Sequence, residues 1–511
     1  MEVPQSWAVW CVSAVVISLV SIAVRWCFHR SRYFQLGERV PGPAGVPLLG
    51  NTLQVVARRE DILRYFKELR DRYGAMVRLW IGPIICVCVT DPKDIAVIFN
   101  SSKTLNKPMF YKTLNVVFGN SVLTAESEDW KRYRKILDPA FRNQIVDSYV
   151  STFHEKSQRL ADLLEEHSVG EPINMADYSR PCTLKMISET SLGLPMEIQG
   201  KNHTHCAVEN FPKITEMDSF VFITPWLWLS WTLKCHRIYY NMIALVTPIR
   251  SFVNLIVKDK LDLYLHLKNN VTHNQKDIDT PKHLRFLEQM VSTLVENPKI
   301  LNLEELKDQT MLVIAAGTDS TAYTVATTLM LLGLHQDVQR KVFQEQEIIF
   351  GEDMSRSVTA EDLKQMVYLE QVINETMRLY PVVPLVARRA DEDVHVNSYT
   401  FPAGTIFVIP IYLVHRESDY FPNPDAFNPG RFSRENSASR PASSFIPFTY
   451  GRKTCIGKRY AYTAMKTMLS VLLRRYEVLE CGSREYMESF GYNFFLNFQT
   501  GHKVKLGPRM K

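Results

Sequence analysis

Apolar residues recur every three to four positions along most of this chain, the spacing that places them on one face of a helix. This pattern predicts helices at 61–73, 128–142, 146–166, 183–192, 238–267, 303–334, 336–350, 359–379 and 457–476. Two regions rich in β-branched and aromatic residues predict strands instead: a hairpin at 75–89 that turns at Gly82-Pro83, and a β region at 399–414. The expected fold class is therefore mainly α with a minor β-sheet region.

The domain organisation follows from where this pattern is interrupted. Three prolines and three glycines fall between 41 and 50, and after residue 50 neither a repeat nor a linker-like stretch appears. A chain of 511 residues is longer than a usual domain of about 100–200 residues. We nevertheless expect one large domain at 51–511 that wraps a large cofactor, preceded by an anchor with its basic flank at 1–36 and a proline-rich hinge at 37–50.

The N-terminal segment 7–24 contains 18 residues without a charge, which as a helix would span about 27 Å, close to the thickness of a thin bilayer. Arg25, Arg30 and Arg32 follow it, so the positive-inside rule keeps the rest of the chain in the cytosol. A cleaved signal peptide would instead have basic residues before the apolar run. A retained anchor is predicted, with the aromatic segment 220–231 as a second contact at the membrane interface.

Composition excludes several other classes of protein. The 60 basic and 54 acidic residues are interleaved and leave a net charge of +6, which does not favour a nucleic-acid binder. The nine cysteines are scattered without paired spacing, so neither a disulfide framework nor a zinc site is expected. Scattered free cysteines fit a body that lies in a reducing compartment such as the cytosol.

One cysteine stands in a distinctive loop, Phe448-Thr449-Tyr450-Gly451-Arg452-Lys453-Thr454-Cys455-Ile456-Gly457, directly before a predicted helix. Backbone N–H groups and the positive end of the helix dipole favour a thiolate there. Gly451 allows a tight turn, and Gly457 lets the backbone approach the sulfur. Taken alone, a single cysteine is most often a buried core thiol.

This loop resembles the haem-binding loop of the cytochrome P-450 superfamily, Phe-x-x-Gly-x-Arg-x-Cys-x-Gly. The resemblance implies haem b with Cys455 as the axial thiolate ligand of the iron, and Phe448 packed against the ring. Two positions depart from the common pattern: Lys453 replaces an arginine that pairs with a haem propionate, and Thr449 replaces a smaller or amide residue. Lysine keeps the positive charge but cannot donate the two parallel hydrogen bonds of a guanidinium, so weaker anchoring of the propionate is expected.

Further segments extend the resemblance over nearly the whole chain. Glu375 and Arg378 match the Glu-x-x-Arg motif, and Arg431 is the implied third member of a buried structural network, with Gly430 where an acid is usual. Without a third member, Glu375 and Arg378 would form an exposed salt bridge on a helix, which contributes little to stability. Trp130, Arg134 and Arg388 match residues that contact the haem propionates. The stretch 368–388 looks most like the animal family-four group, particularly its insect members.

The helix predicted at 303–334 contains Ala315-Ala316-Gly317-Thr318-Asp319-Ser320-Thr321, which resembles the oxygen-side motif of the family. The resemblance implies that the small residues Ala316 and Gly317 let the backbone lie across the haem. Ser320, at a position where threonine is usual, would donate a proton to the bound oxygen, and Asp319 would relay protons from solvent. Thr321 is the rival hydroxyl. Packing through small residues, with hydroxyls bonded back to the preceding turn, is the alternative. Ala316 replaces a glutamate that links covalently to haem in several fatty-acid hydroxylases, so a non-covalent haem is expected and fatty-acid ω-hydroxylation loses support.

The resemblance implies a membrane-anchored haem-thiolate monooxygenase that inserts one atom of O2 into a lipophilic substrate, such as a hormone, a fatty acid or a xenobiotic including insecticides. No dinucleotide-binding fingerprint is present, so electrons must come from another protein. NADPH-cytochrome reductase is implied, with a cytochrome b-type protein as a second donor, and the endoplasmic reticulum (microsomal) membrane as the location. The expected cationic docking face comprises Lys131, Arg132, Lys135, Arg452, Lys458 and Arg459.

Two other functions remain open at this stage: a haem-thiolate isomerase or dehydratase acting on a peroxide, and a non-catalytic haem sensor. The first would have no use for a proton relay at Asp319 and Ser320, and the second would turn over no substrate with NADPH and a reductase. The segments expected to line substrate access are 110–123, 220–231, 385–387 and 490–498.

Overall fold

The computed structural model describes residues 10, 31–167, 171–195, 206–271, 284–479, 487 and 490–509. The predicted membrane-spanning segment 7–24 lies outside these residues, apart from Trp10. The chain divides into two compact units: the described residues up to Pro108 with Ala387–Pro410, and Met109–Val386 with the chain from Ile411 onward. The single domain expected at 51–511 and its boundaries with the anchor and hinge remain predictions.

The smaller unit is built around a four-stranded sheet. Its strands lie in the order β1 (Met76–Ile81), β2 (Ile84–Val89), β7 (Ile406–Ile409) and β4 (Val386–Arg389). β1 and β2 are antiparallel and turn at Gly82, whose φ of 55° suits glycine, whereas β7 runs parallel to β2. The predicted hairpin is therefore confirmed. A second pair, β5 (Val394–Val396) and β6 (Tyr399–Phe401), is antiparallel.

Helices and the proline-rich segment complete the smaller unit. The helices are α2 (Arg32–Glu38), α3 (Thr52–Ala57), α4 (Ile62–Tyr73), α5 (Pro92–Asn100) and η1 (Ser102–Thr104). The last glycine of the proline-rich segment, Gly50, forms a β-bridge to Ile81 and has a φ of 59°. A Cβ at Gly50 would lie 2.3 Å from the carbonyl oxygen of Trp80, so only glycine fits this approach to β1.

The larger unit is mostly helical. Its helices are η2 (Met109–Leu114), α6 (Asn115–Phe118), α7 (Ser127–Leu137), η3 (Asp138–Phe141), α8 (Asn143–Ser148), α9 (Val150–Leu164), η4 (Glu165–His167), α10 (Met175–Ile187), η5 (Ser188–Leu192), α11 (Cys206–Phe222), η6 (Pro225–Leu227), α12 (Ser230–Cys235), α13 (Arg237–Val271), α14 (Phe286–Glu296), α15 (Leu303–Leu334), α16 (Gln336–Phe350), α17 (Ala360–Gln365), α18 (Val367–Leu379), α19 (Ile411–Val414), η7 (Pro429–Phe432), α20 (Arg434–Ser437), η8 (Ala442–Ser444), η9 (Gly451–Lys453) and α21 (Lys458–Arg475). Its strands are β3 (Ile173–Asn174), β8 (Tyr476–Leu479), β9 (Phe490–Asn493), β10 (Phe495–Phe498) and β11 (Lys503–Pro508).

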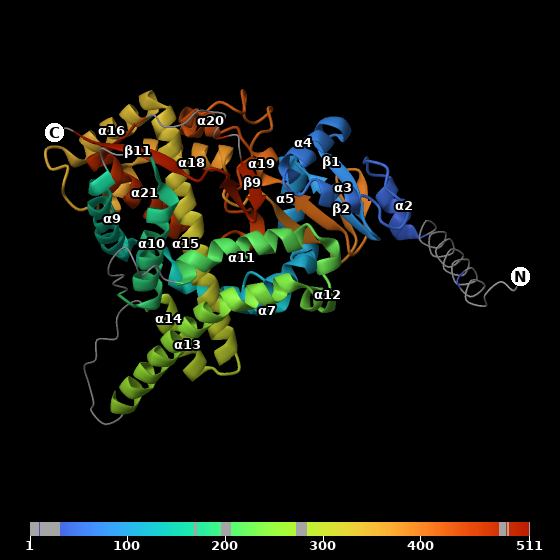
Figure 1. Ribbon diagram of the computed structural model, residues 1–511, viewed down its shortest axis with the longest axis horizontal. Helices are drawn as coiled ribbons and strands as arrows, with labels where there is room; N and C mark the ends of the chain where they lie inside the picture. The colour runs from blue at the N-terminus through green and yellow to red at the C-terminus, as the bar shows by residue number, and fades with distance from the viewer. Residues whose placement is uncertain are drawn as a thin grey trace, which may run out of the picture. The chain divides into compact units, whose positions relative to one another are not determined.

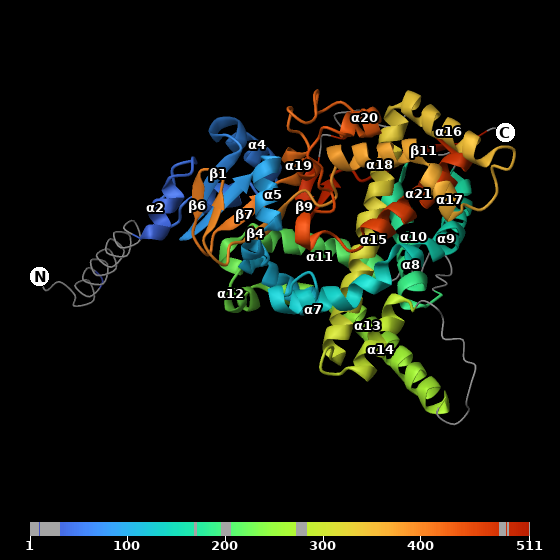
Figure 2. The same cartoon turned by 180° about the vertical axis from the view of Figure 1, so that it is seen from behind.

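Helix α15 forms the centre of the larger unit. Asn302 caps its first turn by accepting from the N–H of Glu305, and the Glu305 carboxylate accepts from the N–H of Asn302 in return. The helix is apolar all round and packs against α10, α18 and α21, as Figures 1 and 2 show from opposite sides. The sequence predicted its bounds without error.

The remaining strands of the larger unit lie beside this core. Strands β3, β11 and β8 form a three-stranded antiparallel sheet. Strands β9 and β10 form a hairpin that turns at Phe494, whose φ is 61°. Helix α11 packs on β9 and on η2, so three of the predicted access segments come together in this unit.

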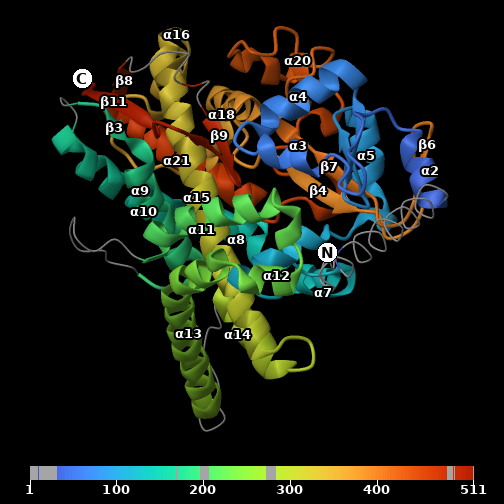
Figure 3. The same cartoon turned by 45° about the vertical axis from the view of Figure 1, so that its right-hand side comes forward.

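Five predicted elements are wrong in detail. The helix expected at 183–192 begins at Met175 as α10, and the helix expected at 128–142 gives way to η3 at Asp138. The helix expected at 146–166 is divided at Tyr149, and the helix expected at 359–379 is divided at Met366. The β region expected at 399–414 ends at Ile409 because Pro410 has no N–H for the sheet, and 411–414 form the helix α19. Helix α13, by contrast, extends the predicted helix at both ends and packs against α14 (Figure 3).

Candidate haem site

The loop that carries Cys455 is held in shape by its own backbone. The N–H of Cys455 donates to the carbonyl of Phe448 over 2.9 Å, and the N–H of Thr449 donates to the carbonyl of Ile446 over 2.9 Å. Gly451 has a φ of 70°, as its predicted turn requires, and Thr449 has a φ of 60°, which is costly for a β-branched residue. The Thr449 hydroxyl donates to the carbonyl of Lys453 over 3.0 Å, which helps to hold this conformation.

The Cys455 thiol lies three residues before α21. Cys455 is exposed, yet protein atoms crowd its sulfur, and burial among them raises the pKa of the thiol. The N–H of Gly457 and the charges of Arg134 and Lys458 act in the opposite direction and lower it. The N–H of Gly457 thus acts in the direction that the sequence analysis expects of a group before a helix, while burial opposes it. A metal bound to the sulfur would deprotonate it outright.

The two predicted propionate residues of α7 lie against this loop. The Arg134 guanidinium donates to the carbonyl of Thr454 over 2.7 Å and pairs with Asp138 at 2.5 Å. The Lys453 ammonium lies 4.8 Å from the centroid of the Trp130 ring. Two motifs that are far apart in the sequence thus meet, and they place two cationic groups and one indole next to Cys455.

Arg388 lies in β4, in the smaller unit. Its side chain is 4% exposed, donates to the carbonyl of Ala387 over 3.0 Å and lies over the ring of Phe99 at 4.7 Å from its centroid. Its predicted contact with a haem propionate remains a prediction.

The middle of α15 carries an accessible stripe on an otherwise buried helix. Ala316 is exposed, and Val313, Gly317 and Ser320, which lie within one turn of it on the same face, are half-buried. Thr321 is buried. The Ser320 hydroxyl donates to the carbonyl of Ala316 over 2.7 Å, which is the back-bonded arrangement considered as the alternative to a proton role.

Gly317 lies where α15 contacts the end of α10. The helix is continuous through this position. A Cβ there would lie 2.8 Å from the Cδ1 atom of Ile187, at the end of α10. Gly317 therefore allows α10 to pack closely against the middle of α15.

Asp319 is engaged with a partner that the sequence did not reveal. Its carboxylate accepts from the Arg180 Nε over 2.9 Å, and the Asp319 side chain is almost fully buried. Burial raises the pKa of Asp319, and the positive charge of Arg180 partly offsets that rise. Arg180 also donates to the carbonyl of Val208. The proposed proton-relay carboxylate thus belongs to a buried ion pair between α15 and α10.

The three members of the predicted structural network do come together. Arg378 pairs with Glu375 at 2.6 Å, and Arg431 reaches the same carboxylate at 3.4 Å. Glu375 and Arg378 are fully buried, so this is not the exposed helix pair considered as the alternative. The Arg378 guanidinium also donates to the carbonyls of Pro424 and Ala426, at 2.6 and 3.0 Å. The network joins α18 to the segment that precedes η7.

His415 is a second residue that the sequence did not reveal. Its Nε2 accepts from the N–H of Ile446 over 2.8 Å, and Nδ1 lies 3.3 Å from the carbonyl oxygen of Met377. The ring is fully buried, and burial with the nearby Arg378 charge lowers its pKa to about 3, so the imidazole is neutral. His415 ties α18 to the chain just before the Cys455 loop. Nothing in the sequence around it marks this role.

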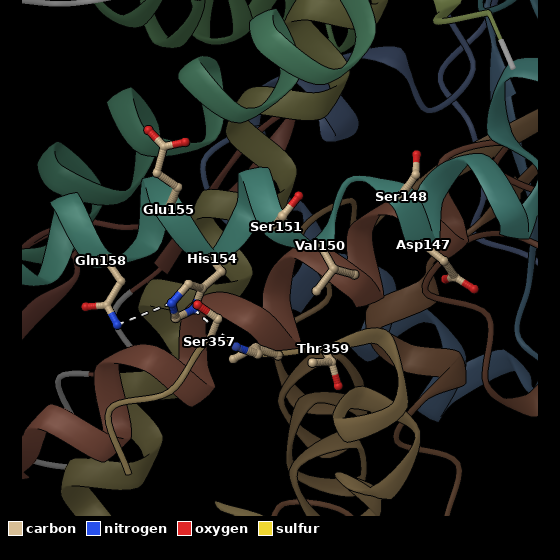
Figure 4. A pocket seen from close by; sticks show the side chains of 10 residues that line it. Asp147, Ser148, Val150, Ser151, His154, Glu155, Gln158, Ser357 and Thr359 are labelled. Atoms are coloured by element: carbon tan, nitrogen blue, oxygen red, sulfur yellow. Dashed lines mark hydrogen bonds between the residues drawn. The ribbon is translucent and has the colours of Figure 1, made fainter. Parts of the chain in front are cut away.

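A pocket lies on another part of the larger unit (Figure 4). It has a volume of about 610 Å³ and is lined by residues of α8, α9 and 357–359. His154 lines it and accepts weakly from the N–H of Val358 over 3.5 Å, and Asp147 on its rim pairs with Arg459 at 2.7 Å. None of the residues predicted to hold haem lines this pocket.

The residues around Cys455 fit a haem group. The accessible sulfur of Cys455 could serve as the metal ligand, and the small accessible side chains on α15 could face an apolar ring. Arg134 beside Thr454 and Lys453 beside Trp130 could pair with carboxylates. Helix α21, which follows Cys455, packs against α15, which carries the stripe. These features define a haem protein whose iron is held by a cysteine thiolate.

Comparison with known proteins identifies the family. A family description, Cytochrome P450, matches residues 40–505. The chain is 30% identical over 512 residues to cytochrome P450 4c3 of Drosophila melanogaster, covering 96% of this chain and 93% of that protein. It is 31% identical over 497 residues to mouse cytochrome P450 4V2 (96% and 92%) and 31% over 503 residues to human cytochrome P450 4V2 (97% and 94%). The chain belongs to the cytochrome P450 family and is a haem-thiolate monooxygenase.

Proposed function

We propose that this protein is a microsomal monooxygenase in which Cys455 is the thiolate ligand and a lipophilic compound, of the hormone, fatty-acid or xenobiotic class, is the substrate. The observation that carries the proposal is the contact of α7 with the Cys455 loop, through Arg134 and Thr454. Haem supplies the activation of dioxygen when it is bound. The side chains of this protein hold the group, exclude water and move protons.

The proposed roles of the holding residues follow from their contacts. Cys455 supplies the sulfur, while Arg134 and Lys453 offer positive charge to propionates, with Arg388 as a further candidate. Glu375, Arg378 and Arg431 fix the backbone that leads to the loop. The small residues Ala316 and Gly317 leave room over the face of the group, and Ala316 offers no carboxylate for a covalent link.

A lipophilic substrate is supported by an aromatic wall. The Phe222 ring of α11 lies 5.0 Å from the Phe110 ring of η2 and 5.6 Å from the Phe494 ring between β9 and β10. The Trp228 ring lies 5.1 Å from Phe110. Three segments expected to line substrate access thus share one cluster, and aromatic surfaces of this kind bind apolar compounds.

Electrons are proposed to arrive from NADPH through a cytochrome reductase, with a cytochrome b-type donor as a second source. Three of the six cations expected to dock it are engaged: Lys131 with Glu128, Arg132 with Glu305, and Arg459 with Asp147. Lys135, Arg452 and Lys458 are exposed, and neither Lys135 nor Lys458 forms an ion pair with another described residue. We infer that Lys135 and Lys458 form the centre of the docking surface, which is smaller than the sequence suggested.

A reconstitution tests this function. The haem-loaded protein, NADPH, the reductase and isotopically labelled dioxygen should give a lipophilic product that carries one labelled oxygen atom. Lys458→Glu should raise the KM for the reductase about tenfold at low salt, and high salt should remove the difference because it screens the charges. The control is Lys213→Glu, on the exposed side of α11. Product formed from a hydroperoxide alone, with no consumption of NADPH, would contradict the proposal.

The endoplasmic reticulum membrane is the proposed location. Trp226, Leu229 and Trp231 are 51%, 44% and 68% exposed, beside Tyr240 at 63%. Trp228, also expected at the membrane, is instead buried, and its N–H donates to the carbonyls of Val221 and Phe222. Among the described residues, one helix, α13, is long and apolar enough to cross a membrane by length and composition. One third of its apolar stretch is buried, and the helix packs on α11, α14 and α15.

In a chain lacking residues 1–36, Trp226→Ser with Trp231→Ser should reduce binding to liposomes about tenfold, because the indole rings favour the membrane interface. Flotation of the protein with the vesicles measures this binding. Ile348→Ser removes an apolar side chain that is 85% exposed on α16 and should leave binding unchanged. If the truncated chain does not bind vesicles before the tryptophans are changed, the second membrane contact is wrong.

A further inference from the structure

Asp218 is a buried acid for which the described residues provide no partner. It lies in α11 and is 2% exposed. Its Oδ1 atom has no hydrogen-bond partner, and no ion pair involves this carboxyl group among the residues that the structure describes. A buried polar group without a partner costs free energy, and a buried charge costs more. Such a group in an enzyme needs an explanation other than stability.

The surroundings of Asp218 are the aromatic wall proposed to bind the substrate. Asp218 lies four residues before Phe222, so the two side chains share one face of α11. That helix packs on η2 and β9, and Phe222 contacts Phe110 and Tyr111 of η2 at ring separations of 5.0 and 5.2 Å. Burial raises the pKa of Tyr492 in β9, and both Tyr111 and Asp218 add to that rise. Asp218 therefore lies where η2, α11 and β9 meet.

The Asp218 carboxyl has no positively charged counterpart among the described residues. Burial raises the pKa of Asp218 well above its usual value, and no positive side chain of the described residues offsets that rise. Asp319 shows the contrast, because Arg180 pairs with it at 2.9 Å. Without a ligand, burial thus favours the neutral, protonated form of the Asp218 carboxyl.

We propose that Asp218 is a substrate anchor that binds the nitrogen of lipophilic amines, with the apolar part of the amine against the aromatic wall. This proposal rests on the proposed function, which makes that wall part of the substrate site. A neutral amine takes the proton of the Asp218 carboxyl, which gives an ammonium paired with a carboxylate and leaves the net charge of the site unchanged. The faces of Phe110, Tyr111 and Phe222 add cation–π attraction for that ammonium.

The same arrangement disfavours a lipid carboxylate at this position. A fatty-acid anion near Asp218 would meet either a like charge or a neutral acid, and the part of the chain that the structure describes places no cation beside this carboxyl group. The anchor thus selects amines among the lipophilic compounds that the aromatic wall accepts. The preference for amines would come from a single carboxyl group, so an isosteric substitution of that group can test it.

The test compares two probes of matched shape: a tertiary amine with a phenylbutyl chain, and its isostere in which a CH group replaces the nitrogen. Their dissociation constants are measured by equilibrium dialysis on the full-length, haem-loaded protein. The amine should bind at least about tenfold more tightly than the isostere. Asp218→Asn, which keeps the shape of the side chain, should abolish this preference and change binding of the isostere by less than about twofold. Glu216→Gln, on the exposed side of the same helix, should retain the preference.

An amine preference that survives in Asp218→Asn would overturn the anchor, since the nitrogen would then be held elsewhere, for instance by the iron. Equal binding of the two probes to the unchanged protein would also overturn it. The carbon monoxide difference spectrum of each preparation separates these outcomes from a failure of the proposed function. With a thiolate band present, they refute the anchor alone, and without that band the haem assignment and the anchor both fail.

Discussion

Glu375→Gln should lower the free energy of unfolding by about 3–5 kcal/mol and cause loss of haem. The carboxylate of Glu375 lies between the guanidinium groups of Arg378 and Arg431, at 2.6 and 3.4 Å, and Arg378 is fully buried. Neutralising this carboxylate leaves a buried cation without its counter-ion. Because the network fixes the chain that leads to the Cys455 loop, we expect the ligand geometry to be lost with it.

Urea unfolding and the haem content per protein measure this effect. Glu361→Gln is the matched control, since Glu361 also pairs with a cation three residues away, Lys364 at 2.7 Å, but on the surface. An exposed pair of this kind contributes at most about 1 kcal/mol. Equal losses of stability in the two variants would show that the buried network has no special role.

Asp319→Asn should slow turnover by about 100-fold or more, because a positioned acid–base group contributes about 10²–10⁴-fold. The change also removes the charge that balances Arg180, so turnover alone would not separate proton delivery from packing. A proton-delivery role predicts that the rate ratio between light and heavy water also changes in the variant. A purely structural role predicts a lower rate with an unchanged ratio.

Ser320 supplies the second part of the same prediction. In the structure its hydroxyl donates to the carbonyl of Ala316, and it must rotate to serve a substrate or dioxygen. Ser320→Ala should lower the fraction of NADPH electrons recovered as product, and Ser320→Thr should raise it because the β-branch restricts the rotamer. If Ser320→Ala leaves this fraction unchanged and Thr321→Ala destroys it, the assignment moves by one residue. If neither change matters, the hydroxyl relay is wrong.

The sequence predicted those parts of the fold that depend on neighbours along the chain. The bounds of α15 followed from the apolar pattern of 303–334, and the hairpin of β1 and β2 followed from Gly82-Pro83. The division at Met366 could not be predicted, because the N–H groups that begin α18 donate to Glu345 of α16. A tertiary cap of this kind leaves no local signal.

The same distinction applies to the candidate site. The Cys455 loop, the Glu375 network and the contact of α7 with the loop all rest on motifs that are compact in the sequence. Arg180 and His415 were missed, since Arg180 is 139 positions from Asp319 and His415 is 31 positions from Ile446. Asp218 also has no motif around it. Its proposed role was inferred only from its burial and from the lack of a hydrogen-bond partner for its Oδ1 atom among the described residues.

The most direct test of the account is the carbon monoxide difference spectrum of the reduced protein. Ligation by the Cys455 thiolate predicts a Soret band at about 450 nm in the unchanged chain. Cys455→Ser should lose this band, whereas Cys182→Ser, which changes a buried cysteine of α10, should retain it. A band at the same position in the Cys455→Ser variant would contradict the account, because the iron would then be held by another residue.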